Sequence, residues 1–132
     1  MAKKKVFVSF DYDNDRKYRD LLRAWDANPD FDFSFNETSP KVAVDSNDAA
    51  VVKRVLSQKI GEATHLLCIV GKQTHKSGWV TWEINKAKEL KKKLVGVKID
   101  QENTSPAVLL GSGAGWAMSF TRDAVLKALR DA

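Results

Sequence analysis

The sequence predicts an α/β fold built on a parallel sheet of five strands with helices on both faces. Short apolar runs alternate along the chain with segments whose apolar residues recur at helical spacing. The run at 64–70 is apolar on both faces, as expected for a strand at the centre of such a sheet. The 132 residues suffice for one hydrophobic core, so we expect a single domain over 1–132.

An acidic turn joins the first predicted strand to the first helix. Residues 6–10 are β-branched or aromatic apart from Ser9, which predicts a buried strand. Residues 11–15 read Asp-Tyr-Asp-Asn-Asp, a composition typical of a turn that caps a helix. Apolar residues then recur at helical spacing as far as Trp25, and the helix is expected to stop at 28–29, Asn-Pro.

The second strand and the loop after it are more polar. Phe31, Phe33 and Phe35 alternate with polar residues, which predicts a strand with one polar face at an edge of the sheet. A polar stretch, 36–48, follows and is expected to be a long loop. Long loops in small domains are often functional, although simple surface tolerance of length is the alternative.

The remaining elements continue the alternation of helix and strand. Gly61 is expected to close a second helix. The inner face of that helix is expected to carry Val52, Val55, Leu56, Lys59 and Ile60. The later elements are a helix over 79–92, a strand over 94–99, a short strand over 116–120 and a helix, capped by Thr121, that carries Val125, Ala128 and Leu129. Five such strands suit the flavodoxin-like order 2-1-3-4-5.

Composition favours an intracellular, cytoplasmic protein. No apolar run is long enough to cross a membrane, so no membrane contact is expected. Cys68 is the only cysteine, which suits a reducing compartment, and its place in an apolar strand favours a buried thiol over a nucleophile. The net charge of +5 owes much to lysines at 3–5 and 88–93. No basic stripe is interleaved with aromatics, so a solubilising role is favoured over nucleic-acid binding.

The stretch 77–83, Ser-Gly-Trp-Val-Thr-Trp-Glu, is the most informative in the chain. Ser77 can cap a helix on which Trp79 and Glu83, one turn apart, share a face. Ligands of parallel α/β sheets bind beyond the carboxyl ends of the strands where the winding direction switches, here between strands one and three. The opposite wall of that crevice is expected to carry Phe10, Asp11 and Tyr12.

Other familiar occupants of this fold lack their motifs here. A receiver domain needs an aspartate after the third strand, where this chain has Gly71 and Lys72. A flavodoxin needs a hydroxyl-rich phosphate loop after the first strand, and the acidic turn at 11–15 would repel phosphate. No P-loop, dinucleotide fingerprint or nucleophile elbow is present. His65 and His75 lack partners at ligand spacing, so no metal site is expected.

A carboxylate flanked by aromatics is the chemistry that remains. A carboxylate can hydrogen-bond sugar hydroxyls and can stabilise an oxocarbenium ion as a glycosidic bond breaks. A neighbouring aromatic offers a stacking face for a base or a pyridinium ring. Glu83 with Trp79 would do both. The alternative is that Glu83 is a solvated helix residue, as most helical glutamates are.

At these residues the chain resembles the TIR domain family, especially the short prokaryotic TIR-like proteins that include the TIR component of Thoeris anti-phage defence. Residues 6–10 and the turn after them resemble the family's first strand, and 36–48 lies where the family has its BB loop. Trp79 and Glu83 resemble the family's Trp-x-x-x-Glu, whose glutamate is catalytic in members that cleave NAD. The three phenylalanines of the second strand and the region after Asp100 depart from the family pattern.

The resemblance implies an NAD glycohydrolase or ADP-ribosyl cyclase, with NAD as its substrate and no cofactor. Glu83 would hold the hydroxyls of the nicotinamide-bearing ribose and stabilise the cation, while Trp79 would pack on the nicotinamide or adenine side. Phe10, Asp11 and Tyr12 would line the opposite wall. The product would be ADP-ribose, or a cyclic isomer that acts as a messenger for a separate effector.

Self-association through the 36–48 loop is also implied by the resemblance. One alternative is a non-catalytic TIR adaptor that binds other proteins through that loop. Another is a flavodoxin-like domain that binds an unrelated nucleotide, or nucleic acid, through its basic patches.

Overall fold

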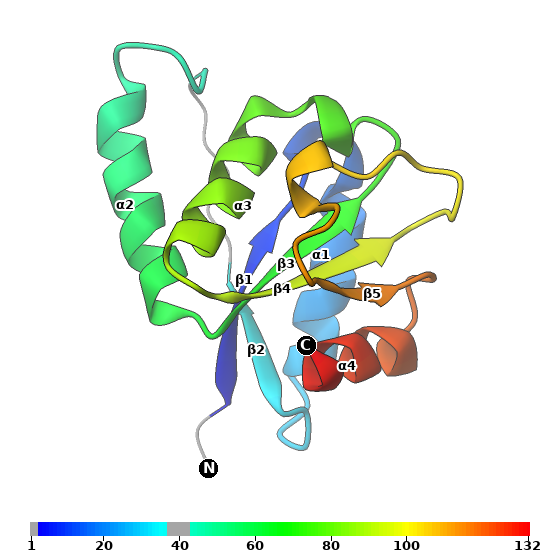
Figure 1. Ribbon diagram of the computed structural model, residues 1–132. Coiled ribbons are helices and arrows are strands. Elements are labelled where there is room, and N and C mark those ends of the chain that lie inside the picture. The colour runs from blue at the N-terminus through cyan, green and yellow to red at the C-terminus, as the bar shows by residue number, and fades with distance from the viewer. Residues whose placement is uncertain (1–2, 37–42) are drawn as a thin grey trace.

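A five-stranded parallel sheet with helices on both faces forms the protein (Figure 1). The computed structural model describes residues 3–36 and 43–132. The strands are β1 (Lys4–Ser9), β2 (Phe33–Asn36), β3 (His65–Val70), β4 (Lys93–Lys98) and β5 (Gly115–Ala117). The helices are α1 (Tyr12–Asp26), α2 (Ala49–Glu62), α3 (Gly78–Glu89) and α4 (Arg122–Asp131), with short 3₁₀ turns at Thr74–Lys76 and Ala107–Leu109. The strand order β2-β1-β3-β4-β5 confirms the flavodoxin-like order predicted from the sequence.

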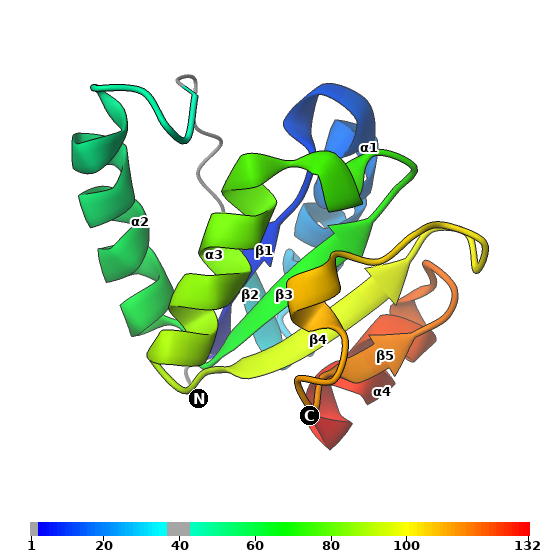
Figure 2. The ribbon, with the colours of Figure 1, turned by 45° about the horizontal axis from the view of Figure 1, so that its top comes forward.

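Two helices cover each face of the sheet, so the protein has two hydrophobic cores. Leu22 of α1 and Leu129 of α4 belong to the core on one face, whereas Leu56 of α2 and Ile84 of α3 belong to the core on the other. Figure 2 shows α2 and α3 together on one side of the strands. Every residue of β3 is buried, because this strand lies between the two cores. The prediction of a central third strand is confirmed.

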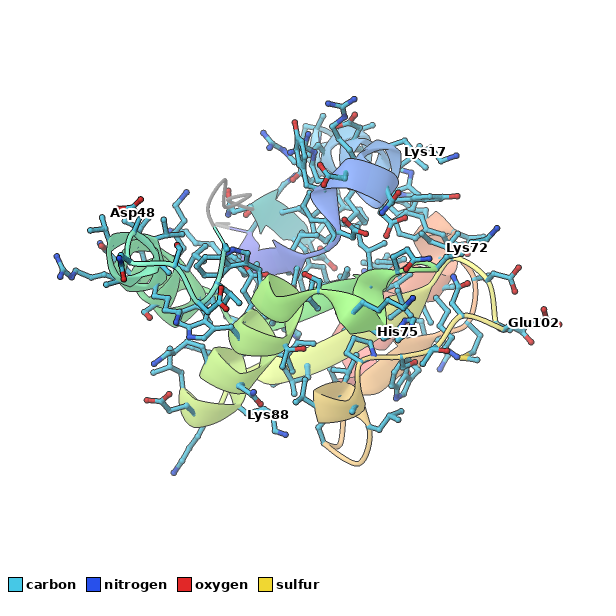
Figure 3. All side chains as sticks on the ribbon, turned by 90° about the horizontal axis from the view of Figure 1, so that it is seen from above. Lys17, Asp48, Lys72, His75, Lys88 and Glu102 are labelled. Carbon is cyan, nitrogen blue, oxygen red and sulfur yellow. The ribbon has the colours of Figure 1, made fainter. Side chains whose placement is uncertain are left out.

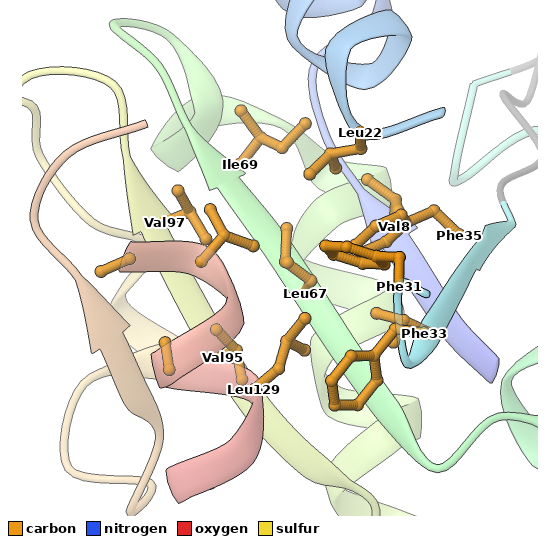
Figure 4. Close-up of a cluster of buried hydrophobic side chains, with 14 residues drawn as sticks. Val8, Leu22, Phe31, Phe33, Phe35, Leu67, Ile69, Val95, Val97 and Leu129 are labelled. Atoms are coloured by element: carbon orange, nitrogen blue, oxygen red, sulfur yellow. The ribbon is translucent and has the colours of Figure 1, made fainter. Parts of the chain in front are cut away.

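Aromatic residues of the edge strand β2 and of the segment just before it fill the core under α1 and α4. Phe31, Phe33 and Phe35 are all buried, and the ring of Phe31 lies 6.3 Å from that of Phe33 and 5.7 Å from that of Phe35. Figure 4 shows Phe31, Phe33 and Phe35 together in the cluster of buried side chains that also holds Leu22 and Leu129. The residues between them are less buried, with Ser34 half-buried, so the alternation predicted both the strand and its edge position correctly.

Helix α2 buries a narrower stripe than the sequence predicts. Leu56 and Ile60 are buried, but Val55 is 43% exposed and Lys59 is also exposed. Neighbouring residues on a helix differ by about 100° around its axis, so a stripe centred on Leu56 and Ile60 turns the other two toward solvent. The prediction that Gly61 closes the helix is wrong, because α2 continues to Glu62.

Several element boundaries also differ from the predicted ones. Strand β1 ends at Ser9, so Phe10 lies just beyond the sheet. Helix α3 ends at Glu89, and Lys91 follows with a left-handed φ of 58° that cannot continue a helix. None of the helices among the described residues is long and apolar enough to cross a membrane.

Candidate active site

Helix α3 begins with a capped turn that places Trp79 and Glu83. Ser77 Oγ accepts a hydrogen bond of 3.2 Å from the backbone N–H of Val80, which satisfies one of the unpaired donors of the first turn. The predicted cap is therefore confirmed. Trp79 is half-buried in the first turn, and Glu83 is buried one turn later.

The Glu83 carboxylate lies against the end of β1 and is shielded from solvent. Glu83 is 3% exposed, which excludes the alternative of a solvated helix residue. Ser9 Oγ, at the last position of β1, donates a hydrogen bond of 2.7 Å to Glu83 Oε1. In the register of β1 with β3, Ser9 is paired with Cys68. The carboxylate therefore lies where the winding of the sheet switches direction, as predicted.

Sequence reasoning missed the role of Ser9. It is the one polar residue of the predicted run 6–10, and it is fully buried. A buried hydroxyl needs a hydrogen-bond partner, so its presence in an otherwise apolar strand was the available signal.

Cys68 is a buried thiol within β3 that two carboxylates affect. It is fully buried, and burial raises the pKa of its thiol. The negative charges of Glu83 and Asp15 raise this pKa further. The prediction of a buried structural cysteine is confirmed, because a thiolate is strongly disfavoured here.

Two aromatic rings near the start of α1 lie beside two guanidinium groups of the same helix. Phe10 is half-buried and Tyr12 is 40% exposed, with their ring centroids 6.0 Å apart. The guanidinium carbon of Arg19 lies 5.8 Å from the Phe10 ring, and that of Arg16 lies 5.4 Å from the Tyr12 ring. Asp11 is half-buried at the N-cap of α1. Phe10, Asp11 and Tyr12 thus follow β1 directly, although their contact with a substrate stays a prediction.

Asp15 is a second buried carboxylate near the strand ends, and sequence reasoning did not assign it to the site. The sequence predicts a helix-capping turn over 11–15 and gives no sign that any of its carboxylates is buried, whereas Asp15 is only 5% exposed. Its Oδ2 atom lies 3.3 Å from Thr74 Oγ1, on the connection from β3 to α3. Burial raises the pKa of the Asp15 carboxyl, and the hydrogen bond from Thr74 opposes that rise. We use the name switch-point cluster for Ser9, Asp15, Thr74 and Glu83.

The described end of the predicted 36–48 loop packs against the start of α3. A Cβ atom on Gly78 would lie 2.7 Å from Val44 Cγ1, so only a glycine leaves room for this valine. Residues 37–42 lie outside the described residues, so the prediction for that part of the loop stays a prediction. The contact brings residues 43–48 next to the turn that carries Trp79.

Figure 3 views the carboxyl-terminal edge of the sheet from above, with α1 and α3 on either side of the strand ends. It labels Lys72 and His75 on the connection that precedes α3. His75 Nδ1 is buried without a hydrogen-bond partner among the described residues. Within that same part of the chain, no group of three or more His, Cys, Asp or Glu residues is arranged to hold a metal ion.

A separate cavity of about 210 Å³ lies between α2 and the edge of the sheet. It is lined by residues 5–7 of β1, by Asn36 and by residues of the C-terminal end of α2, including Lys59 and Glu62. None of the predicted site residues lines it. This cavity is therefore distinct from the switch-point cluster.

Comparison with protein families identifies the chain. Residues 7–104 match the family model described as Thoeris protein ThsB, TIR-like domain. The chain belongs to this family. The matched range contains every predicted site residue, so the resemblance first suggested by Trp79 and Glu83 is confirmed for most of the chain. No curated protein sequence matches it.

Solved structures share the fold of this ThsB-type TIR-like domain at low sequence identity. A 2-deoxyribosyltransferase from Bacillus psychrosaccharolyticus aligns with a TM-score of 0.59 and 16% identity, covering 92% of this chain and 95% of that one. A conserved protein from Enterococcus faecalis V583 aligns with a TM-score of 0.62 and 10% identity, covering 98% and 99%. The TIR domains of the activated Roq1 resistosome align with a TM-score of 0.51 and 19% identity, covering 73% of this chain and 57% of that one. These likenesses show the α/β fold.

Proposed function

We propose that this TIR-like domain cleaves NAD, as an NAD glycohydrolase or ADP-ribosyl cyclase. The observation that carries the proposal is the buried Glu83 carboxylate, oriented by Ser9 at the switch point of the sheet. Trp79, one helical turn earlier, supplies an aromatic face beside it. Membership of the Thoeris TIR-like family supports a role in defence, in which a cyclic product would signal to a separate effector.

In the proposed reaction the bond between the nicotinamide nitrogen and the ribose C1′ breaks. The bonding electron pair stays on nitrogen, so a neutral nicotinamide leaves and the positive charge passes to the ribose. The Glu83 carboxylate stabilises this oxocarbenium ion and holds the ribose hydroxyls. Water, after losing a proton, completes ADP-ribose; attack by another nucleophile of the same molecule completes a cyclic isomer.

The other residues of the site orient the groups that react. The hydrogen bond from Ser9 holds Glu83 Oε1 in one position, which avoids reorganisation when charge develops. Trp79 stacks on the nicotinamide or adenine side, and Phe10, Asp11 and Tyr12 form the facing wall. Arg16 and Arg19, above the rings of that wall, suit the negative diphosphate of NAD.

Nicotinamide release by wild type and Glu83→Gln tests this function. The glutamine keeps the shape of the side chain but removes the negative charge, so we expect release to fall by about 100-fold or more. The measurement is chromatographic separation of the products after incubation with NAD. Glu89→Gln is the matched control, because Glu89 is exposed on the same helix, where it forms a surface ion pair with Lys86.

Equal release by Glu83→Gln, or no release by wild type under conditions that promote self-association, contradicts the enzymatic function. Binding of a protein partner that survives in Glu83→Gln, together with an inactive wild type, would instead select the adaptor.

Self-association through the 36–48 loop belongs to the same proposal. Analytical ultracentrifugation of a Val44→Asp variant tests it, because Val44 lies in the described part of that loop.

A further inference from the structure

Negative charge gathers at the switch-point cluster although the whole chain carries a net charge of +5. Asp15 and Glu83 are both buried there, one on α1 and one on α3. Asp15 contacts Thr74 and fills the space beside Gly71, just after β3, while Glu83 contacts Ser9 at the end of the neighbouring strand β1. The two carboxylates therefore lie at adjacent strand ends, and both raise the pKa of the Cys68 thiol within β3. Buried charges interact more strongly than exposed ones because less water screens them.

The Asp15 carboxyl group packs closely against the backbone of Gly71. A Cβ atom built on Gly71 would lie 2.2 Å from Asp15 Oδ2 and 2.5 Å from Oδ1. The carboxyl group therefore occupies the space that any larger residue at position 71 would fill. Its position is set by the backbone at the end of β3, so its charge is fixed relative to the neighbouring strand ends.

Few groups compensate the charge of Asp15. Thr74 Oγ1 accepts a hydrogen bond of 2.8 Å from the Gly71 N–H, and it lies 3.3 Å from Asp15 Oδ2 and 3.1 Å from the Ile69 carbonyl oxygen. The hydroxyl has one hydrogen, so it cannot donate to both acceptors at once. Within residues 3–36 and 43–132, no Lys, Arg or His forms an ion pair with Asp15. Its negative field is therefore only weakly cancelled.

We propose that Asp15 is a specificity-determining residue whose negative charge selects a positively charged ring at the switch-point cluster. The inference rests on the proposed function, in which that ring is the nicotinamidium of oxidised NAD. The reduced dinucleotide has almost the same shape but a neutral ring. A carboxylate that acts through its field, together with Glu83, distinguishes the two without touching either.

The energetic cost of burying the charged Asp15 carboxylate supports the same role. Burial raises the pKa of Asp15 above its ordinary value of 3.8; the charge of Asp11 adds to the rise, and Lys17 opposes it. An uncharged side chain of the same shape avoids this penalty. Asp15→Asn is therefore expected to raise the melting temperature at neutral pH. The gain should vanish below about pH 3.8, where Asp15 is protonated in both the folded and unfolded states.

Dissociation constants for oxidised and reduced NAD test the proposal. Both are measured in a Glu83→Gln background, which prevents turnover and leaves Asp15 as the remaining buried carboxylate of the cluster. We expect about tenfold tighter binding of the oxidised form. Adding Asp15→Asn should bring the ratio close to one. Asp13→Asn is the matched control, because Asp13 lies on the same helical turn but is exposed.

A smaller pair of probes separates this inference from the proposed function. 1-Methylnicotinamide is a cation and nicotinamide is neutral, and the binding of each is followed by NMR on wild type. A preference for the cation that depends on Asp15, without nicotinamide release from NAD, supports the inference and contradicts the function. Conversely, suppose that wild type releases nicotinamide and that Asp15→Asn prefers the cation as much as wild type does. That result supports the proposed function and contradicts the inference.

The pH dependence of wild type gives a test that needs no variant. The preference for the cation should fall as pH is lowered through the raised pKa of Asp15, because protonation removes its charge. The charged groups that act on Asp15 are Asp11, at the N-cap of α1, and Lys17 on α1. The titratable groups on the packed elements are Cys68 on β3, whose thiol is affected by both carboxylates, and Glu83 on α3. Three results would overturn the proposal. They are the same fall with pH in Asp15→Asn, loss of the preference for the cation in Asp13→Asn, or no such preference in the protein without these substitutions.

Discussion

The Ser9 hydroxyl helps to fix the position of the Glu83 carboxylate. Ser9 donates to Glu83 Oε1 over 2.7 Å, and both residues are buried. A carboxylate in a dry site that loses such a donor becomes harder to keep charged and freer to rotate. Under the proposed function, Ser9 would therefore act through Glu83 rather than on the substrate itself.

Removing this hydroxyl should lower the rate more than it weakens substrate binding. For Ser9→Ala we expect kcat for nicotinamide release to fall about tenfold or more, with a smaller change in KM, because a buried hydrogen bond to a charged group contributes about 1.5–3 kcal/mol. Steady-state kinetics measure both constants. Ser57→Ala is the control, since the Ser57 hydroxyl donates a hydrogen bond to the Lys53 carbonyl within α2. An unchanged kcat in a folded Ser9→Ala variant contradicts this role.

Spacing on one helix could predict Trp79 and Glu83, but it could not predict Asp15. Acidic residues are common at helix starts whether their side chains face water or protein, so the composition of 11–15 carries no signal of burial. Asp15 is buried because Gly71, far away in the sequence, leaves space for it. Such a fit depends on the tertiary packing of α1 against the end of β3.

At the scale of elements, the loop before α2 and the start of α3 share one contact. Val44 packs where a side chain on Gly78 would otherwise lie. Alanine is a better helix former than glycine by about 1 kcal/mol, so the glycine at this position is explained by packing rather than by helix stability.

A double-mutant cycle tests this explanation. Gly78→Ala alone should destabilise the protein or leave its stability unchanged, since the added methyl group displaces Val44. In a Val44→Ala background the same substitution should stabilise by about 0.5–1 kcal/mol, the ordinary helix-propensity gain. Urea unfolding of the four proteins gives the coupling. Equal effects of Gly78→Ala in both backgrounds would show that the two residues do not interact.

The elements themselves followed well from periodicity, and the errors lie where tertiary packing decides. The apolar run of β3 and the alternating phenylalanines near β2 have one structural solution each, a central strand and an edge strand. In α2, Val55 matches the helical period but faces solvent, because only a narrow face of the helix, with Leu56 and Ile60, packs against the sheet. Gly61 predicted the end of α2 one residue too early, since the helix continues to Glu62.

Over the whole molecule, the two ends of the sheet differ in chemistry. The carboxyl-terminal end holds the buried carboxylates, whereas the other end holds the buried His65 at the start of β3. Its Nε2 atom lies 3.0 Å from the Leu129 carbonyl oxygen, which ties β3 to α4. Burial lowers the pKa of His65 below its ordinary value of 6.5, and the Leu129 hydrogen bond opposes that shift.

Stability should therefore fall on mild acidification through His65. Since the folded protein binds this proton less readily than the unfolded chain, the contribution is complete above about pH 6.5 and is lost as pH falls through the lower folded pKa. Urea unfolding between pH 8 and 5 measures it. His65→Gln should remove this part of the pH dependence. A wild type and a variant with parallel profiles would contradict the assignment.

The contact between Ser9 and Glu83 joins positions 74 residues apart in the sequence. No local segment can form it alone, because β1, β3 and α3 must all be in place first. Under the proposed function, nicotinamide release would therefore return in a refolding experiment only after the last long-range pairing, later than the helical circular dichroism signal. Its recovery would then report when folding is complete.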